Sequence, residues 1–406
     1  MLARFLTLLV STGLLLAESA AVEQAWRLAA NGQQEQAINL LNETIQQNPA
    51  DPDARLLLGS LLSEAGHRDQ AFLQLSEAVR LRPRSSEAQN ALGEAYSSFG
   101  FTQQARHAFE RAVALNPNSG VAQLNLGRNL LERHELNAAE LTVVAGHLDR
   151  AIRVLKPDAD AATAHYLRAK VYTQQGNAKQ AAAQLEQALS IQADFPEAWS
   201  DLGQARKNLS DDAGAVAALE QAVKRNAADS VAQYRLGEEY LKQNQVQLAV
   251  VHLEQAYRLD PGDQSILNAF QRALRRDGRV DEAEEMKRKL AEVLQKRDES
   301  TRNELAATRM NNTGAQLQKE GNLKGALEKY RSALALNPSN VPIRVNLAIA
   351  LLRLGQWTDG LNTLHDALLR DVSNTKIRAA LKDAVAQAPA DAVPHWKEEP
   401  IELSVR

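Results

Sequence analysis

The sequence predicts an all-α protein built from a repeated pair of helices, and three observations support this. A turn position occupied mostly by glycine recurs every 34 residues, and a small residue follows five positions later. Each interval also holds two stretches whose apolar residues have helical spacing. Because the chain is rich in Ala, Leu, Gln and Glu, its composition favours helices as well. A fixed period of this length is typical of a helical solenoid.

The turn position can be followed along nearly the whole chain. It keeps its spacing except for two jumps of 42 and 43 residues, at Gly32, Gly66, Gly100, His134, Gly176, Ser210, Asn244, Gly278, Gly321 and Gly355. The small residues five positions later are Ala37, Ala71, Ala105, Ala139, Ala181, Ala215, Ala249, Ala283, Ala326 and Gly360. Ten repeats of 34 residues, with inserts of 8 and 9, account for residues 18–374.

The clearest repeat is Ser86–Ser119. Its first stretch has apolar residues at helical spacing within 92–99, and Gly100 then ends the helix. The second stretch, within 105–113, ends before Pro117, since proline cannot continue a helix. Small residues allow two helices to approach closely. We therefore expect alanines such as Ala105 and Ala249 to be buried where the paired helices cross.

These residues resemble the tetratricopeptide repeat (TPR) family. The family pattern of Trp, Leu-Gly, Tyr, Gly, Ala, Phe, Ala and Pro is matched by Leu92-Gly93, Tyr96, Gly100, Ala105, Phe109, Ala112 and Pro117. Two further repeats match through Trp199, Leu202-Gly203, Ala215, Leu219 and Ala222, and through Leu236-Gly237, Tyr240, Ala249, Leu253, Ala256 and Pro261. The resemblance implies a right-handed superhelical solenoid of helix-turn-helix units with a C-terminal capping helix.

The register predicts the following organisation. After a signal peptide at 1–21, the solenoid covers 22–297, with repeats at 18–51, 52–85, 86–119, 120–161, 162–195, 196–229, 230–263 and 264–297. Residues 298–306 form a linker or a helix extension, 307–374 two further repeats, 375–388 a capping helix and 389–406 an extended tail.

Two inserts interrupt this register. In the repeat from 120, the segment Ala139–Gly146 lengthens either the second helix or its turn. Near the second insert, Thr301 and Glu304 fit a capping box, which places a boundary at 298–302. The alternative is a continuous solenoid with one overlong helix.

The N-terminus has the layout of a secretory signal peptide. Arg4 precedes an apolar run at 5–17, and small residues follow up to Ala21. The run is shorter than the roughly 20 residues of a membrane span. We expect cleavage after Ser19 or Ala21 and a periplasmic or secreted protein. The alternatives are an uncleaved membrane anchor and an apolar first helix packed on the repeats.

The sequence gives little sign of chemistry. There is no cysteine, no Walker or Rossmann glycine motif and no HExxH. His107 and Glu110 have a metal-like spacing but lack a third ligand, and the acidic stretch 281–285 suits the start of a helix. The net charge of -3 provides no drive toward nucleic acid. We therefore expect no cofactor, no metal, no nucleic-acid partner and no enzyme.

The resemblance implies that the first helix of each repeat lines a concave groove. Residues two, five, nine, twelve and thirteen of each repeat would then face a partner. The front would show Asp53, Glu64, Glu87 and Glu94, the middle Leu124 and Glu238 among others, and the back Arg353 among others. Asparagines at the sixth position of a repeat are also candidates, because some family members use them to bind a peptide backbone. The candidate partner-binding residues are Asn125, Arg128, Tyr166, Lys170, Tyr234, Arg272, Arg275, Arg276, Asn312, Lys319 and Asn346.

Together these features predict a non-enzymatic scaffold that binds an extended protein segment in its groove, in the cell envelope. One alternative is an assembly factor for an envelope machine that builds pili, outer-membrane proteins or exported polysaccharide. Another is a non-catalytic partner module of an enzyme. We expect the acidic part of the bound segment to lie over the three arginines at 272–276.

Overall fold

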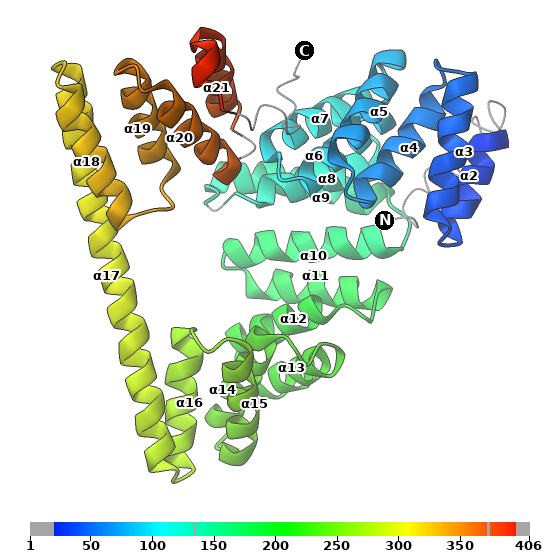
Figure 1. Cartoon of the computed structure of the whole chain (residues 1–406). Helices are drawn as coiled ribbons and strands as arrows, with labels where there is room; N and C mark the ends of the chain where they lie inside the picture. The colour runs from blue at the N-terminus through cyan, green and yellow to red at the C-terminus, as the bar shows by residue number, and fades with distance from the viewer. Residues whose placement is uncertain (1–19, 134, 372–373, 395–406) are drawn as a thin grey trace. The chain divides into compact units, whose positions relative to one another are not determined.

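The computed structural model describes residues 20–133, 135–371 and 374–394. Within these residues the regular structure consists of twenty α-helices and one short 3₁₀ helix (Figure 1), which confirms the all-α prediction. The predicted signal peptide lies outside the described residues except for Ala20 and Ala21. The part of the predicted tail from residue 395 onward also lies outside them.

The chain divides into two compact units, Met1–Ala283 and Glu284–Arg406, and each is described by itself. In the N-terminal unit, helices pair in sequence, and each second helix packs on the first helix of the next repeat. The first helices are α2 (Ala20–Ala30), α4 (Pro52–Glu64), α6 (Ser86–Ser98), α8 (Gly120–Leu131), α10 (Ala159–Gln174), α12 (Pro196–Asn208), α14 (Ser230–Lys242) and α16 (Gln264–Arg276). The second helices are α3 (Gln34–Gln47), α5 (Arg68–Leu81), α7 (Thr102–Leu115), α9 (Ala138–Val154), α11 (Ala178–Ile191), α13 (Asp212–Arg225) and α15 (Val246–Leu259), followed by the start of α17 (Val280–Lys319).

The predicted turn positions end the first helices with left-handed backbone. Seven turn glycines have φ between +73° and +83°, a region that favours glycine because it has no Cβ. The next amide closes the cap, as the Phe101 amide does by donating to the Tyr96 carbonyl at 2.8 Å. Ser210 and Asn244 adopt the same conformation, with φ of 61° and 59°, although both carry a side chain.

Close helix crossings hold each repeat together. A Cβ added to Gly93 would lie 2.6 Å from the Phe109 ring, so the first helix passes directly over the second. Ala105 and Ala249, predicted to be buried at such crossings, are both 0% exposed. A substitution to a larger residue at these positions would force the helices apart.

The first insert lengthens both the turn before α9 and the start of α9, which has 17 residues where the other second helices from α3 to α15 have 14. Leu148 contacts Gly127 as Phe109 contacts Gly93, yet it follows its glycine by 21 residues and not by 16. The residue equivalent to Ala105 is therefore Val144, which is buried, whereas Ala139 is exposed. Asn137 starts the displaced helix with a capping box. The remaining extra residues lengthen the start of α10.

Three half-buried histidines join the helices of their repeats through glutamine. The His147 imidazole contacts the Gln123 side-chain oxygen at 2.6 Å, and His252 contacts the corresponding Gln233 at 2.8 Å. In the repeat from 162 the residue types are exchanged, since His165 lies on the first helix and bonds Gln184 on the second at 2.8 Å. Burial lowers the pKa of His147 and of His252.

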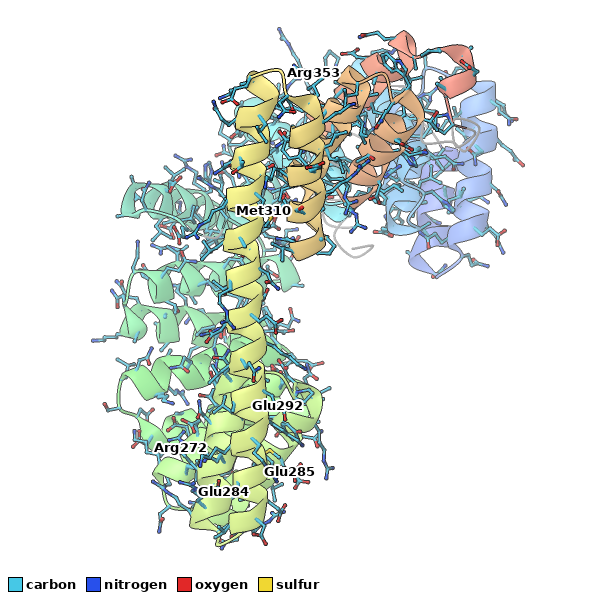
Figure 2. The ribbon with its side chains drawn as sticks, turned by 60° about the vertical axis from the view of Figure 1, so that its left-hand side comes forward. Arg272, Glu284, Glu285, Glu292, Met310 and Arg353 are labelled. Carbon is cyan, nitrogen blue, oxygen red and sulfur yellow. The ribbon has the colours of Figure 1, made fainter. Side chains whose placement is uncertain are left out.

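Helix α17 is continuous across the segment predicted to be a linker or a helix extension (Figure 2). The predicted capping box at Thr301 is wrong: Thr301 lies inside the helix and its hydroxyl donates to the Arg297 carbonyl at 3.0 Å. The residues between 295 and 302 are mostly charged and polar, and all are exposed. This part of the helix therefore has no buried apolar stripe. The start of α17 thus completes the repeat from 264, and its end begins the repeat from 307.

The C-terminal unit contains the rest of α17, then α18 (Leu323–Leu336), α19 (Val341–Arg353), α20 (Trp357–Arg370) and α21 (Thr375–Gln387). Tyr330 of α18 is 1% exposed and covers Gly314 of α17. Helix α21 buries Ile377 and Leu381 against α20, as expected of a cap on the last repeat. The chain then passes through the 3₁₀ helix Ala390–Ala392, whose last carbonyl accepts from Thr358 at 3.1 Å.

Candidate partner-binding face

The first helices of neighbouring repeats contact one another in the N-terminal unit. Contacts join α2 to α4, α4 to α6, α6 to α8, α8 to α10, α12 to α14 and α14 to α16. We call the surface made by these helices the first-helix face. It carries eight of the candidate residues: Asn125, Arg128, Tyr166, Lys170, Tyr234, Arg272, Arg275 and Arg276. The C-terminal unit carries the other three, Asn312, Lys319 and Asn346.

Asn125 joins two repeats and is itself buried, with 4% of its surface exposed. Its amide nitrogen donates to Asn90 at 3.0 Å and to Glu94 at 2.7 Å, so both amide hydrogens are engaged. Asn125 also lines a small pocket with Arg128 and Glu132. Burial raises the pKa of the Glu132 carboxyl, and the charge of Arg128 partly offsets the effect.

Tyr166 is held in place by contacts from several sides. Its ring lies 4.8 Å from the Phe195 ring, and the Lys170 ammonium lies 5.5 Å from its centroid, within cation–π range. Burial raises the pKa of the Tyr166 hydroxyl, and so do the charge of Asp201 and the hydrogen bond to it. Asp201 accepts in turn from Arg235 at 3.1 Å. The ring is therefore held in place and still partly exposed, beside an exposed lysine.

Tyr234 is partly buried on α14, and burial raises its pKa, followed by the charge of Glu238. The arginines predicted to receive an acidic ligand are partly engaged by the protein itself. Arg272 forms an ion pair with Glu238, and Arg276 donates to the Leu241 carbonyl at 2.9 Å. All three arginines of α16 are exposed.

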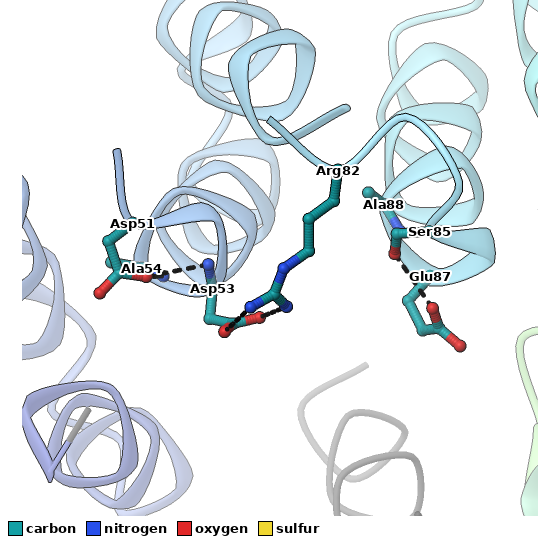
Figure 3. A network of polar contacts seen from close by, with 7 residues as sticks. All are labelled: Asp51, Asp53, Ala54, Arg82, Ser85, Glu87 and Ala88. Carbon is teal, nitrogen blue, oxygen red and sulfur yellow. Dashed lines mark hydrogen bonds and ion pairs between the residues drawn. The ribbon is translucent and has the colours of Figure 1, made fainter. Parts of the chain in front are cut away.

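Two residues predicted to face the groove do not offer a free side chain there. Asp53 receives both guanidinium nitrogens of Arg82 at 2.6 and 2.8 Å, while Asp51 caps α4 (Figure 3). Leu124 is 1% exposed and belongs to the core between α8, α9 and α10. The acidic front of the predicted groove is therefore weaker than the sequence indicated.

Sequence reasoning missed a pattern of polar contacts between consecutive repeats. Asn125 reaches Asn90, and Asn346 reaches Asn311 at 2.9 Å, both across 35 residues. The ion pair of Arg272 with Glu238 and that of Arg235 with Asp201 each span 34 residues. Complementary polar residues one repeat apart were the signal that could have revealed these contacts. We call this set the inter-repeat ladder.

The buried carboxylate of Glu239 was also missed. It is 1% exposed and lies 2.9 Å from the Lys207 ammonium on the neighbouring first helix. A buried charge needs such a partner, and removal of one member is strongly destabilising. We interpret this pair as a structural link between α12 and α14.

In the C-terminal unit, Asn312 and Lys319 are exposed on α17, and Asn346 lies on α19 with its amide bound to Asn311. The His107 and Glu110 pair noted in the sequence is exposed, with 3.5 Å between the two groups. In the part of the chain that the structure describes, no three acidic or histidine residues gather to hold a metal ion. No helix among the described residues is long and apolar enough to cross a membrane.

The stacked helix pairs define a helical-repeat protein of the kind that binds other proteins. Tetratricopeptide repeat models match residues 28–96, 90–151, 200–264 and 317–384, and a TPR repeat model matches 169–210. These matches cover more than half of the chain, so it belongs to the tetratricopeptide repeat family. TPR domains are protein–protein interaction scaffolds and are typically non-catalytic, and the family matches include no enzyme family.

No match was found among curated proteins. Among solved structures, PilF from Pseudomonas aeruginosa is 18% identical, with 55% of this chain and 97% of that chain covered and a TM-score of 0.49. PilW, described as a type IV pilus biogenesis factor, is 17% identical over 53% and 97%, with a TM-score of 0.46. A TPR protein from Thermus thermophilus is 24% identical over 47% and 100%, with a TM-score of 0.37. At these values the similarity concerns the repeat fold alone.

Proposed function

We propose that this protein is a non-enzymatic scaffold of the cell envelope that binds an extended segment of a partner protein along the first-helix face. The observation that carries the proposal is the arrangement around Tyr166. Its ring is fixed by Phe195 and Asp201, and the exposed Lys170 lies beside it. A rigid aromatic ring that is partly exposed offers apolar contact area at a low cost in conformational entropy.

The inter-repeat ladder supports this assignment. Side chains that are already hydrogen-bonded do not need to be ordered when a partner binds. The face therefore combines a preorganised polar surface with two partly exposed tyrosines, Tyr166 and Tyr234. An extended segment suits such a face because it can contact several consecutive first helices.

Site-specific photo-crosslinking in the native cell tests the proposal. A photoreactive residue at Lys170 on the first helix should capture a partner, whereas the same residue at Lys179 on the second helix should not. Both lysines are exposed and belong to one repeat, so they form a matched pair. Equal capture from both positions, or capture that survives Tyr166→Ala together with Tyr234→Ala, would rule out the first-helix face.

The envelope location is supported by Arg4 and the apolar run at 5–17. Helix α2 starts at Ala20 and buries Ala25 and Ala29 in the first core cluster. Cleavage after Ser19 would leave this helix whole, whereas cleavage after Ala21 would shorten its first turn. N-terminal sequencing of the protein from an envelope fraction decides between these sites, and an intact Met1 in a cytoplasmic fraction would contradict the location.

A further inference from the structure

The fourth residue of many repeats lies beneath the turn that leads into its own first helix. In five repeats its side chain donates to the backbone carbonyl six positions earlier in that turn. The residue types differ widely: the donors are Arg55, Gln123, Trp199, Gln233 and Arg344. A large side chain fills the space beside the turn, as Trp199 does with Arg225 stacked 5.2 Å from its centroid.

In the repeat from 120, a pocket of about 360 Å³ opens beside this turn. The compact Gln123 lies on its floor, and the end of α9 forms one wall. The lining is part apolar and part basic, and consists of Val113, Pro117, Asn118, Gln123, Arg150, Arg153 and Val154. The pocket lies at the end of a second helix and is separate from the candidate residues of the first-helix face.

The charges of the pocket are not balanced by the protein. The repeat from 52 serves as a comparison. There Arg80, five residues after the buried Leu75, pairs with Glu77 at 2.9 Å. Arg153 holds the same position after Leu148, but the position of Glu77 is taken by a second arginine, Arg150. Neither Arg150 nor Arg153 has a hydrogen bond or ion pair to any residue that the structure describes, and both are exposed. Arg258, at the equivalent place in the repeat from 230, again has a carboxylate partner, Glu254, at 2.6 Å.

We propose that this pocket binds an acidic segment of a partner protein, whose carboxylate would take the place that Glu77 occupies beside Arg80. An apolar side chain next to that carboxylate would lie on Val113, Pro117 and Val154. The apolar part of the lining favours such a segment over a bare phosphate group. The carboxyl end of α9 contributes only about half a negative charge, which two guanidinium groups outweigh. This second site does not depend on the first-helix face.

Fluorescence anisotropy of the purified full chain tests the proposal with two labelled peptides, one alternating Glu and Leu and one alternating Gln and Leu. We expect the Glu peptide to bind about tenfold more tightly, which equals about 1.4 kcal/mol. Arg150→Gln with Arg153→Gln should remove that preference and its salt dependence. Arg80→Gln, at the paired position, should leave the preference unchanged. Equal thermal unfolding of all proteins would show that they fold alike.

Three results would overturn the proposal. The first is no preference of the unmodified protein for the Glu peptide up to about 1 mM, the weak end of specific affinity. The second is a preference that survives in the protein with both glutamine substitutions. The third is displacement of the Glu peptide by inorganic phosphate or heparin at lower concentrations than by unlabelled peptide, which would identify a phosphate site.

Discussion

The same substitution, glycine to alanine, should have opposite effects at two helical positions of this protein. At Gly237 an added Cβ would lie 2.5 Å from Cγ of Leu253 and 3.3 Å from the carbonyl oxygen of Ala249. Leu253 is 0% exposed, so it is enclosed by the core that the added Cβ would enter. At Gly146, inside α9, an added Cβ meets no atom within 4 Å. Alanine in a helix is favoured over glycine by about 1 kcal/mol at either position.

We therefore expect Gly146→Ala to raise the free energy of unfolding by about 1 kcal/mol. Overpacking costs about 1–3 kcal/mol, so Gly237→Ala should lower the free energy of unfolding by up to about 2 kcal/mol after the helix gain is subtracted. Urea denaturation followed by circular dichroism measures both values. Because each repeat contacts only its neighbours, hydrogen exchange should show the loss around α14 and α15 and not at α4.

The reasoning fails if both variants change stability in the same direction. A destabilised Gly146→Ala protein would mean that α9 is packed on a side where the structure shows open space. An unchanged Gly237→Ala protein would mean that α14 and α15 separate easily. Uniform loss of protection across all repeats would contradict the nearest-neighbour account of stability.

Three further predictions follow from the turns and the core. Ser210 has a φ of 61°, which is strained for a residue with a Cβ, so Ser210→Gly should stabilise the protein by about 1 kcal/mol. Gly176 has a φ of 73°, so Gly176→Ala should destabilise the protein by a similar amount. Thermal unfolding measures both changes. Ala249→Leu should cost about 1–3 kcal/mol, because the alanine is 0% exposed at a helix crossing. Because the pKa values of His147 and His252 are lowered in the native state, that state binds fewer protons than the unfolded state as the pH falls. The stability that the two neutral histidines contribute is complete above about pH 6.5 and is lost as the pH falls through their folded pKa. Replacing both histidines with glutamine should reduce the loss of stability between pH 7 and pH 5, and an unchanged pH profile would contradict this.

The sequence predicted the helical pairs well because a turn position and a helix crossing each restrict the residue type. Only glycine, or a strained substitute, suits the backbone at positions such as Gly100, and only a small residue fits at Ala105. Ala139 was assigned to the helix crossing because the longer turn and longer helix still left an alanine at the expected distance from His134. The buried Val144 shows that a β-branched side chain is accepted at the same crossing.

The candidate face was harder to predict than the fold. Helical register assigned Leu124 and Asp53 to the groove, but their surroundings depend on how closely consecutive repeats stack. That distance decides whether Arg82 reaches Asp53 and whether Arg272 reaches Glu238. Neither contact follows from the period alone, because the period fixes the face of a helix and not the separation between helices.

The inter-repeat ladder changes what charge on this face contributes to partner selection. An acidic ligand over Arg272 must compete with Glu238, whose carboxylate already holds the guanidinium. Exposed ion pairs contribute about 0–1 kcal/mol each, so the exchange of one carboxylate for another gives little net affinity. Tyr166 loses no such internal partner when a ligand contacts its ring. Affinity on the first-helix face should therefore depend more on the tyrosines than on the arginines of α16, with the charges acting mainly on the orientation of the bound segment.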